Sequence, residues 1–237
     1  PALIAPLWWT GALGTFAVSY VVLFGLFTSE RLKLGMVTPA HFIPAVGLVV
    51  IPVAGAPLAA ASEGVLRELA FALNMTGFGA GVFMYVGLLA LTMARHFLGA
   101  PVEGKMTPTL WVHLAPLSVI PLSMLALLKT TGDASLLRYG SLVAAAFLGA
   151  ALWWLAVSMT IRNRRQGKLP FALSWWAFVF PIGACSVLAY RVSELLALEV
   201  LPLVASGLTL LALFVWSATA LGTVRGIRTG AIFAPAH

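Results

Sequence analysis

Seven long apolar segments, separated by short polar stretches, make up almost the whole chain. They cover residues 7–27, 42–61, 69–92, 108–128, 136–161, 171–189 and 201–224. At a helical rise of about 1.5 Å per residue, each segment is long enough to cross a hydrocarbon core about 30 Å thick. A transmembrane β-barrel would instead show alternating segments about ten residues long. The pattern therefore predicts an all-α, polytopic membrane protein with a single transmembrane domain.

Prolines occur inside the second, fourth and sixth segments, whereas the other four have none in their interiors, since Pro202 stands at the start of the seventh. Those inside the three segments are Pro44, Pro52 and Pro57, then Pro108, Pro116 and Pro121, and finally Pro181. A proline inside a helix removes a backbone hydrogen bond at a cost of about 3 kcal/mol, and in lipid the freed group needs protein or water beside it. The alternation predicts helical hairpins in a ring, with kinked helices inside and straight helices outside. The alternative is that the prolines only fit irregular helix packing.

The sixth segment carries a proline with a bulky aromatic residue directly before it, in the stretch SWWAFVFPIGACS at residues 174–186. Pro181 is expected to break the helix, and Phe180 to project at the break. Because such a break needs a neighbouring helix or a water-filled cavity, this segment is expected to line a path across the membrane. Phe180 is then either a constriction of that path or an ordinary packing residue, and spacing alone leaves both open.

Composition agrees with the membrane class. Hydrophobic residues make up 61% of the chain and charged residues 9%, and mean hydropathy is +1.02, whereas about 25% of the residues in a soluble domain are charged. The net charge of +7 is attributed to loop bases that face the cytoplasm and not to nucleic-acid binding.

The loop bases predict the orientation of the chain. One side is expected to carry Arg31, Lys33, Arg95, Lys105, Arg162, Arg164, Arg165, Lys168, Arg225 and Arg228, and the other side Arg67, Lys129, Arg138 and Arg191. Since positive residues concentrate on the cytoplasmic side, the C-terminus is predicted to be cytoplasmic. Seven crossings then place Pro1 outside.

Few residues offer chemistry within the membrane. The acids fall in loops or at segment ends, so no carboxylate pair is placed for acid–base catalysis, and we expect neither an enzyme nor a cofactor. His41 and His113 lie on different segments. They could together bind a metal, but we prefer the interpretation that each lies at the membrane interface or is hydrogen-bonded. Cys185 is the one cysteine. Arg191 lies about 15 Å beyond Pro181 along a helix, where it would either attract anions at the outer mouth or mark the interface.

Five short motifs resemble those of the tellurite-resistance/dicarboxylate transporter family, which includes plant slow anion channels. They are TPAHFIPAVG at residues 38–47, FGAG at 78–81, LAP at 114–116, WWAFVFPIG at 175–183, and TVRG at 223–226 followed by Gly230 and Phe233. They resemble, in order, the fifth, sixth, seventh, ninth and tenth helices of that family. The resemblance extends over essentially the whole chain.

The resemblance implies ten helices, arranged as five hairpins around a central pore that an aromatic residue of the ninth helix blocks. It assigns the pore gate to Phe180 and inner-helix kinks to Pro44, Pro116 and Pro181. It also implies a homotrimer in a bacterial inner membrane, with one pore per subunit. The seven segments here would be the fourth to tenth helices, so three N-terminal helices of the family fold are expected to be missing from this sequence.

The predicted function is passage of small anions or C4-dicarboxylates across the membrane through a phenylalanine-gated pore. A path without buried charge suits such a pore, where basic residues at the mouths and helix dipoles attract the anion. Tellurite resistance is a further function that the family name implies. The alternative, from another class, is a non-transporting membrane subunit that scaffolds a larger complex.

Overall fold

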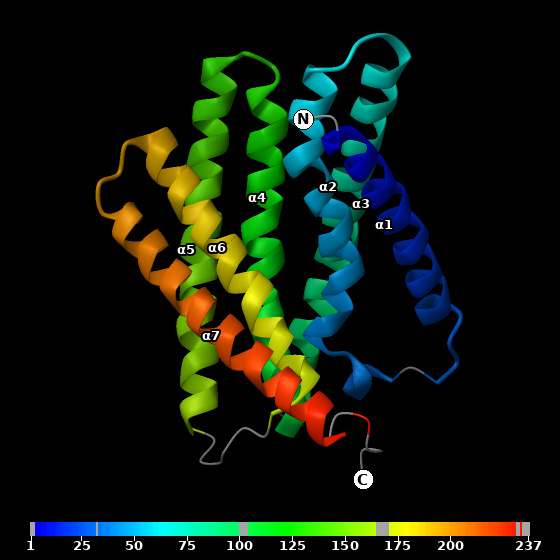
Figure 1. Ribbon diagram of the computed structural model, residues 1–237, viewed down its shortest axis with the longest axis vertical. Coiled ribbons are helices and arrows are strands. Elements are labelled where there is room, and N and C mark those ends of the chain that lie inside the picture. Colours follow the sequence, from blue (N-terminus) through cyan, green and yellow to red (C-terminus); the bar gives the residue numbers. More distant parts are fainter. Residues whose placement is uncertain (1–2, 32, 100–103, 165–170, 231–232, 234–237) are drawn as a thin grey trace.

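The computed structural model describes residues 3–31, 33–99, 104–164, 171–230 and 233, and this part of the chain is helical without any strand (Figure 1). Its α-helices are α1 (Ile4–Phe27), α2 (Phe42–Ala60), α3 (Gly64–Leu98), α4 (Leu114–Lys129), α5 (Ala134–Arg164), α6 (Trp176–Leu196) and α7 (Leu201–Thr229). Four 3-10 segments accompany them: η1 (Leu34–Met36), η2 (Pro39–His41), η3 (Gly104–His113) and η4 (Leu173–Trp175). Seven spans are long and apolar enough to cross a membrane. The predicted all-α, polytopic class is confirmed.

Burial separates the helices into an inner and an outer set, as the prolines predict. The spans that contain α2, α4 and α6 have 56%, 72% and 39% of an 18-residue window buried, whereas the other four have 11–28%. The inner helices lie in a row, with α4 between α2 and α6, and α3, α5 and α7 pack against them as their hairpin partners (Figure 1). The helix α1 packs against α2. The proline-bearing helices are therefore the inner ones.

All three inner helices begin with a 3-10 segment and run in the same direction. The segment η2 leads into α2, η3 into α4 and η4 into α6, and all three beginnings lie at the lower end of the molecule in Figure 1. Pro44 and Pro116 occupy the first turns of α2 and α4. Because a proline has no N–H, it cannot bond the carbonyl four residues earlier. The residues before it are thereby freed to form the tighter i→i+3 bonds of a 3-10 helix.

Several helices extend beyond the apolar segments that the sequence predicts. The helix α3 covers residues 64–98 and not only 69–92, and α6 and α7 continue past residues 189 and 224. Charged residues such as lysine, arginine and glutamate have good helix propensity, so a helix does not end where its apolar run ends. In contrast, residues 108–113 are 3-10 and not α-helical. Arg95, expected in a loop, thus lies within α3, where it is buried and its Nε donates to the Gly35 carbonyl at 3.4 Å.

Two glycines let α3 approach the backbone of α2. A Cβ on Gly77 would lie 2.8 Å from the Leu48 carbonyl oxygen, and one on Gly81 would lie 2.7 Å from the Ala45 carbonyl oxygen. Gly79, on another face of α3, would meet nothing within 4 Å. The i, i+4 pair of small residues matches the close-packing motif of membrane helices. Gly77 therefore covers the carbonyl that Pro52, four residues later, leaves without its helical donor.

Hydrogen bonds from side chains to carbonyls join neighbouring helices. Trp8 Nε1 donates from α1 to the Ile51 carbonyl of α2 at 3.1 Å. The buried hydroxyl of Ser123 in α4 donates to the Val49 carbonyl of the same inner helix, α2. Such bonds hold helices together in lipid, where apolar burial gives little preference for one helix over another. They fix α2 between α1 and α4.

Candidate functional site

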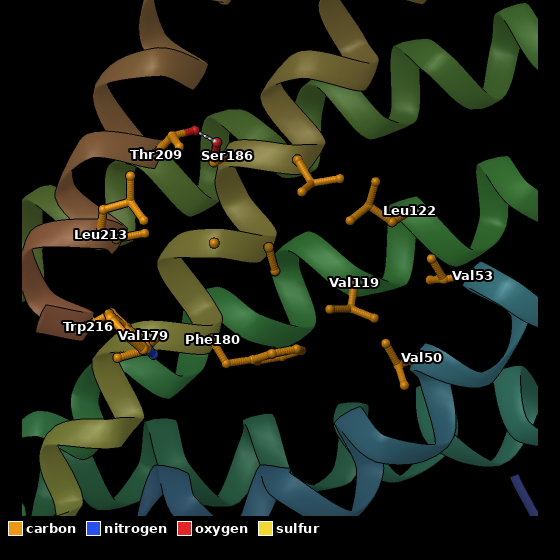
Figure 2. Close-up of a pocket in the computed structure, with 14 residues that line it drawn as sticks. Val50, Val53, Val119, Leu122, Val179, Phe180, Ser186, Thr209, Leu213 and Trp216 are labelled. Carbon is orange, nitrogen blue, oxygen red and sulfur yellow. Dashed lines mark hydrogen bonds between the residues drawn. The ribbon is translucent and has the colours of Figure 1, made fainter. Parts of the chain in front are cut away.

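An open groove of about 580 Å³ runs between the inner helices and α7. Figure 2 shows residues that line it: Val50 and Val53 of α2; Val119 and Leu122 of α4; Val179, Phe180, Gly183, Ala184, Ser186 and Val187 of α6; and Thr209, Ala212, Leu213 and Trp216 of α7. None of these fourteen residues carries a charge. Three of the four helices that line the groove are the inner ones, and the fourth is the outer helix α7.

Phe180 projects from α6 into this groove. Its side chain extends away from α7, toward Val50 of α2 and Val119 of α4 (Figure 2). Half of the Phe180 surface is exposed, in contrast to Phe178, which is 7% exposed and packs edge-on against Trp111 in the core. A half-exposed aromatic ring in an apolar groove can change rotamer without disturbing the packed interior. This is the geometry that a movable constriction needs.

Pro181 directly follows Phe180, and the break expected there is not observed, because α6 is one continuous helix from Trp176 to Leu196. It is a buried proline in the interior of α6, and it leaves the carbonyl of Ala177 without its helical donor. The interiors of the other two inner helices contain Pro52 and Pro57 in α2 and Pro121 in α4. The interior prolines of α2 and α4 are thus not the two that the motifs single out, because Pro44 and Pro116 lie in first turns.

A pair of hydroxyl groups forms a polar patch on the groove wall. Ser186 Oγ of α6 lies 2.6 Å from Thr209 Oγ1 of α7, and each oxygen lies 2.9 Å from the carbonyl oxygen of Ala205 (Figure 2). Sequence reasoning missed this pair, since residues 186 and 209 belong to different helices.

Arg191 lies outside the groove, near the end of α6. Its Nη1 is 2.9 Å from Glu194 Oε2, and both side chains are about half exposed, at 56% and 44%. An exposed ion pair of this kind contributes little to stability. The carboxylate also offsets the positive charge that Arg191 would offer to an anion.

The two histidines that the sequence singles out have hydrogen-bonding partners. His41 Nδ1 accepts from the backbone N–H of Thr38 at 3.1 Å, at the start of η2. His113 is buried, and its Nε2 lies 3.3 Å from Nε2 of His96, with the ring of Trp154 packed 4.5 Å away between centroids. Among the described residues, no three His, Cys, Asp or Glu side chains cluster in a way that could hold a metal ion.

The partner of His113 was not foreseen from the sequence. His96 follows the apolar run 69–92 and reads as a residue of the next loop, whereas the structure places it inside α3. Only the length of α3 brings it against η3. The predicted hydrogen-bonded role of His113 is therefore observed, with an unexpected partner.

Comparison with known proteins gives relatives that are transporters by name. Two proteins of Methanocaldococcus jannaschii, both named uncharacterized transporters, are each 35% identical to this chain over 228 residues, which cover 95% of it and 66% and 67% of their own lengths. A sulfite efflux pump of Arthroderma otae is 27% identical over 192 residues, or 75% of this chain and 50% of the pump. The chain thus spans about two thirds of the length of its archaeal relatives. No solved structure matches it.

The family assignment rests on a match over nearly the whole chain. Residues 1–224 match the family described as voltage-dependent anion channel, SLAC1. This is the family that contains the slow anion channels to which the five motifs point, so the resemblance is confirmed. The chain belongs to the voltage-dependent anion channel family.

Proposed function

We propose that this protein conducts small anions across the membrane through a path that the apolar groove lines, and that Phe180 is its gate. The observation that carries the proposal is the position of Phe180, half exposed in an uncharged groove between the three inner helices. Membership of an anion channel family supports anion transport in general. The assignment of Phe180 as the gate rests on its position in the groove.

Electrostatics of the inner helices supports anions as the permeating species. The positive ends of α2, α4 and α6 lie at one end of the molecule, because the three helices run parallel. Each helix N-terminus carries about half a positive elementary charge. Arg225 and Arg228 of α7 lie at the same end. We propose that this end is cytoplasmic, as the distribution of loop bases predicts.

The substrate class that we favour is small monovalent anions. The lining has no fixed cation to hold a dicarboxylate such as malate. Sulfite belongs in the same assay, because the fungal relatives are named sulfite efflux pumps. Tellurite resistance follows only from the family resemblance. We further propose that Pro44, Pro116 and Pro181 shape the path, the first two through the starts of α2 and α4 and the third within α6. We also propose that the protein is a homotrimer in a bacterial inner membrane, with Arg191 near the outer mouth.

Truncation of the gate tests the proposal. We expect Phe180→Ala to raise chloride current in planar bilayers by about tenfold or more, because removing the ring widens an apolar constriction that excludes ions. Phe83→Ala is the matched control, since Phe83 of α3 is 78% exposed and lies outside the groove. It should leave the current unchanged. Equal currents in Phe180→Ala and the original protein, at equal protein content, would show that Phe180 is not the gate.

A flux assay separates transport from the scaffold alternative. The purified protein in liposomes should pass chloride, nitrate, malate, sulfite or tellurite at a rate above that of empty liposomes. A scaffold subunit would pass none of them, with or without Phe180. The relative rates also identify the preferred anion.

A further inference from the structure

The groove offers a passing anion almost no hydrogen-bond donors. Its lining is aliphatic or aromatic, apart from two hydroxyl groups, on Ser186 and Thr209, and the indole nitrogen of Trp216. An anion that enters such a groove loses part of its hydration, and this costs most for anions that hold water tightly. Any donor on the wall therefore has a large influence on which anions pass.

The hydroxyl pair makes more contacts of hydrogen-bond length than it has protons to donate. Three contacts connect Ser186 Oγ, Thr209 Oγ1 and the Ala205 carbonyl oxygen, at 2.6, 2.9 and 2.9 Å. Each hydroxyl donates one proton, so only two of the three contacts can be hydrogen bonds at one time. Thr209 can donate its proton to Ser186 Oγ, which then remains hydrogen-bonded as an acceptor. The Ser186 proton is then free to donate to another acceptor, such as an anion.

The pair is also placed beyond the gate along the same helix. Ser186 follows Phe180 by six residues, which is about 9 Å along the axis of α6. Thr209 is exposed, whereas Ser186 is only 7% exposed. The Phe180 ring and the hydroxyl pair therefore line the same groove at different heights, the ring on the side of α2 and α4 and the pair on the side of α7 (Figure 2).

We propose that the Ser186–Thr209 hydroxyl pair is a hydrogen-bond donor site for anions in the groove and determines selectivity between strongly and weakly hydrated anions. The proposal rests on the proposed function, anion passage through this groove. Chloride holds its water more tightly than nitrate, so a donor that replaces lost water favours chloride. Without the donors, permeation should follow ease of dehydration, and nitrate should gain over chloride.

The competing explanation is that the pair only fastens α6 to α7. The chain offers a control for this, because a second polar contact joins the same two helices outside the groove: Trp176 Nε1 donates to Thr223 Oγ1 at 3.2 Å. Thr209→Val and Thr223→Val each remove one threonine hydroxyl with nearly the same side-chain shape. A fastening role predicts similar effects of the two variants on stability and no effect of either on selectivity.

The test is the nitrate-to-chloride permeability ratio from reversal potentials of the purified protein in planar bilayers. We expect Thr209→Val and Ser186→Ala each to raise the ratio, and the double variant to raise it on the order of tenfold, as for loss of a hydrogen bond to a charged group. Thr223→Val should leave it unchanged. Melting temperatures in detergent identify any variant that fails to fold. If Ser186→Ala or the double variant fails to fold, the permeability ratio of Thr209→Val decides.

The outcomes separate this inference from the proposed function. An unchanged ratio in folded Thr209→Val or double-variant protein that still carries current overturns the donor site and leaves anion passage standing. An equal rise in Thr223→Val also overturns it, because the effect would then come from the α6–α7 contact. Absence of any anion current in the original protein overturns both.

Discussion

The contact between α3 and α2 makes a sharp prediction for Gly81→Ala. A Cβ at this position would lie 2.3 Å from Val49 Cγ2, 2.7 Å from the Ala45 carbonyl oxygen and 2.8 Å from the Val49 backbone nitrogen. Ordinary contact begins near 3.4 Å, so the two backbones must separate by about 0.7 Å to clear the Ala45 oxygen. Two of the three atoms belong to backbone, which cannot turn aside as a side chain can.

The magnitude follows from two opposing effects. Overpacking of a filled interior typically costs about 1–3 kcal/mol, whereas glycine to alanine in a helix by itself gains about 0.5–1 kcal/mol. Gly79→Ala provides the second effect alone, because its Cβ meets nothing within 4 Å. We therefore expect Gly79→Ala to be slightly more stable than the original protein and Gly81→Ala less stable. Because both variants share the helix gain, the difference between them is the overpacking cost alone, about 1–3 kcal/mol.

Thermal unfolding of both variants in the same detergent measures this difference, with helix content followed by circular dichroism at about 222 nm. A melting temperature for Gly81→Ala at or above that of Gly79→Ala would refute the reasoning. It would mean that α3 does not approach the α2 backbone as closely as the structure has it. Gly77→Ala, which would meet the Leu48 carbonyl at 2.8 Å, should repeat the result.

Two further predictions concern charged residues at the ends of helices. Hydrogen bonds from the Ser135 hydroxyl and from the backbone N–H groups of Leu136 and Ser135 hold the pKa of Asp133 below its ordinary value of 3.8. The contribution of the Asp133 carboxylate to stability is therefore fully present above pH 3.8 and is lost as the pH falls through the lower pKa of the folded state. Asp133→Asn, which keeps the cap but does not titrate, should flatten the melting temperature measured below about pH 4, and an unchanged pH profile would contradict this. Arg191→Gln should change anion conductance by less than about twofold, since an exposed ion pair with Glu194 already offsets the charge; a large loss would show that Arg191 attracts anions at the mouth.

The division into inner and outer helices could be predicted because its signals are local. Apolar length identifies a membrane span, and a proline within it requires a protein neighbour whatever the fold. Burial of α2, α4 and α6 agrees with this. The 3-10 starts were not predicted, since the effect of Pro44 or Pro116 depends on where the helix begins, and helix beginnings are poorly defined in a continuous apolar run.

The groove wall could be predicted only in part. Phe180 was identified through its proline neighbour, which is a feature of one helix. The pairing of Ser186 with Thr209 depends on the register between α6 and α7, and that register is set by the tight turn after Leu196, where Ala197 adopts a left-handed conformation with φ of 53°. A residue other than glycine at such a position gives no signal in the sequence. The contact between Ser186 and Thr209 therefore could not be predicted from the sequence.

The common direction of the three inner helices makes the groove electrically polar although its lining is apolar. Their three positive ends together amount to about 1.5 elementary charges at one end of the molecule, with the matching negative charge at the other end. The outer helices run the opposite way and cancel this field at a distance, but in the groove only α7 opposes three parallel neighbours. The backbone alone thus gives the two ends of the groove different electrostatic potentials, without any charged side chain in its lining.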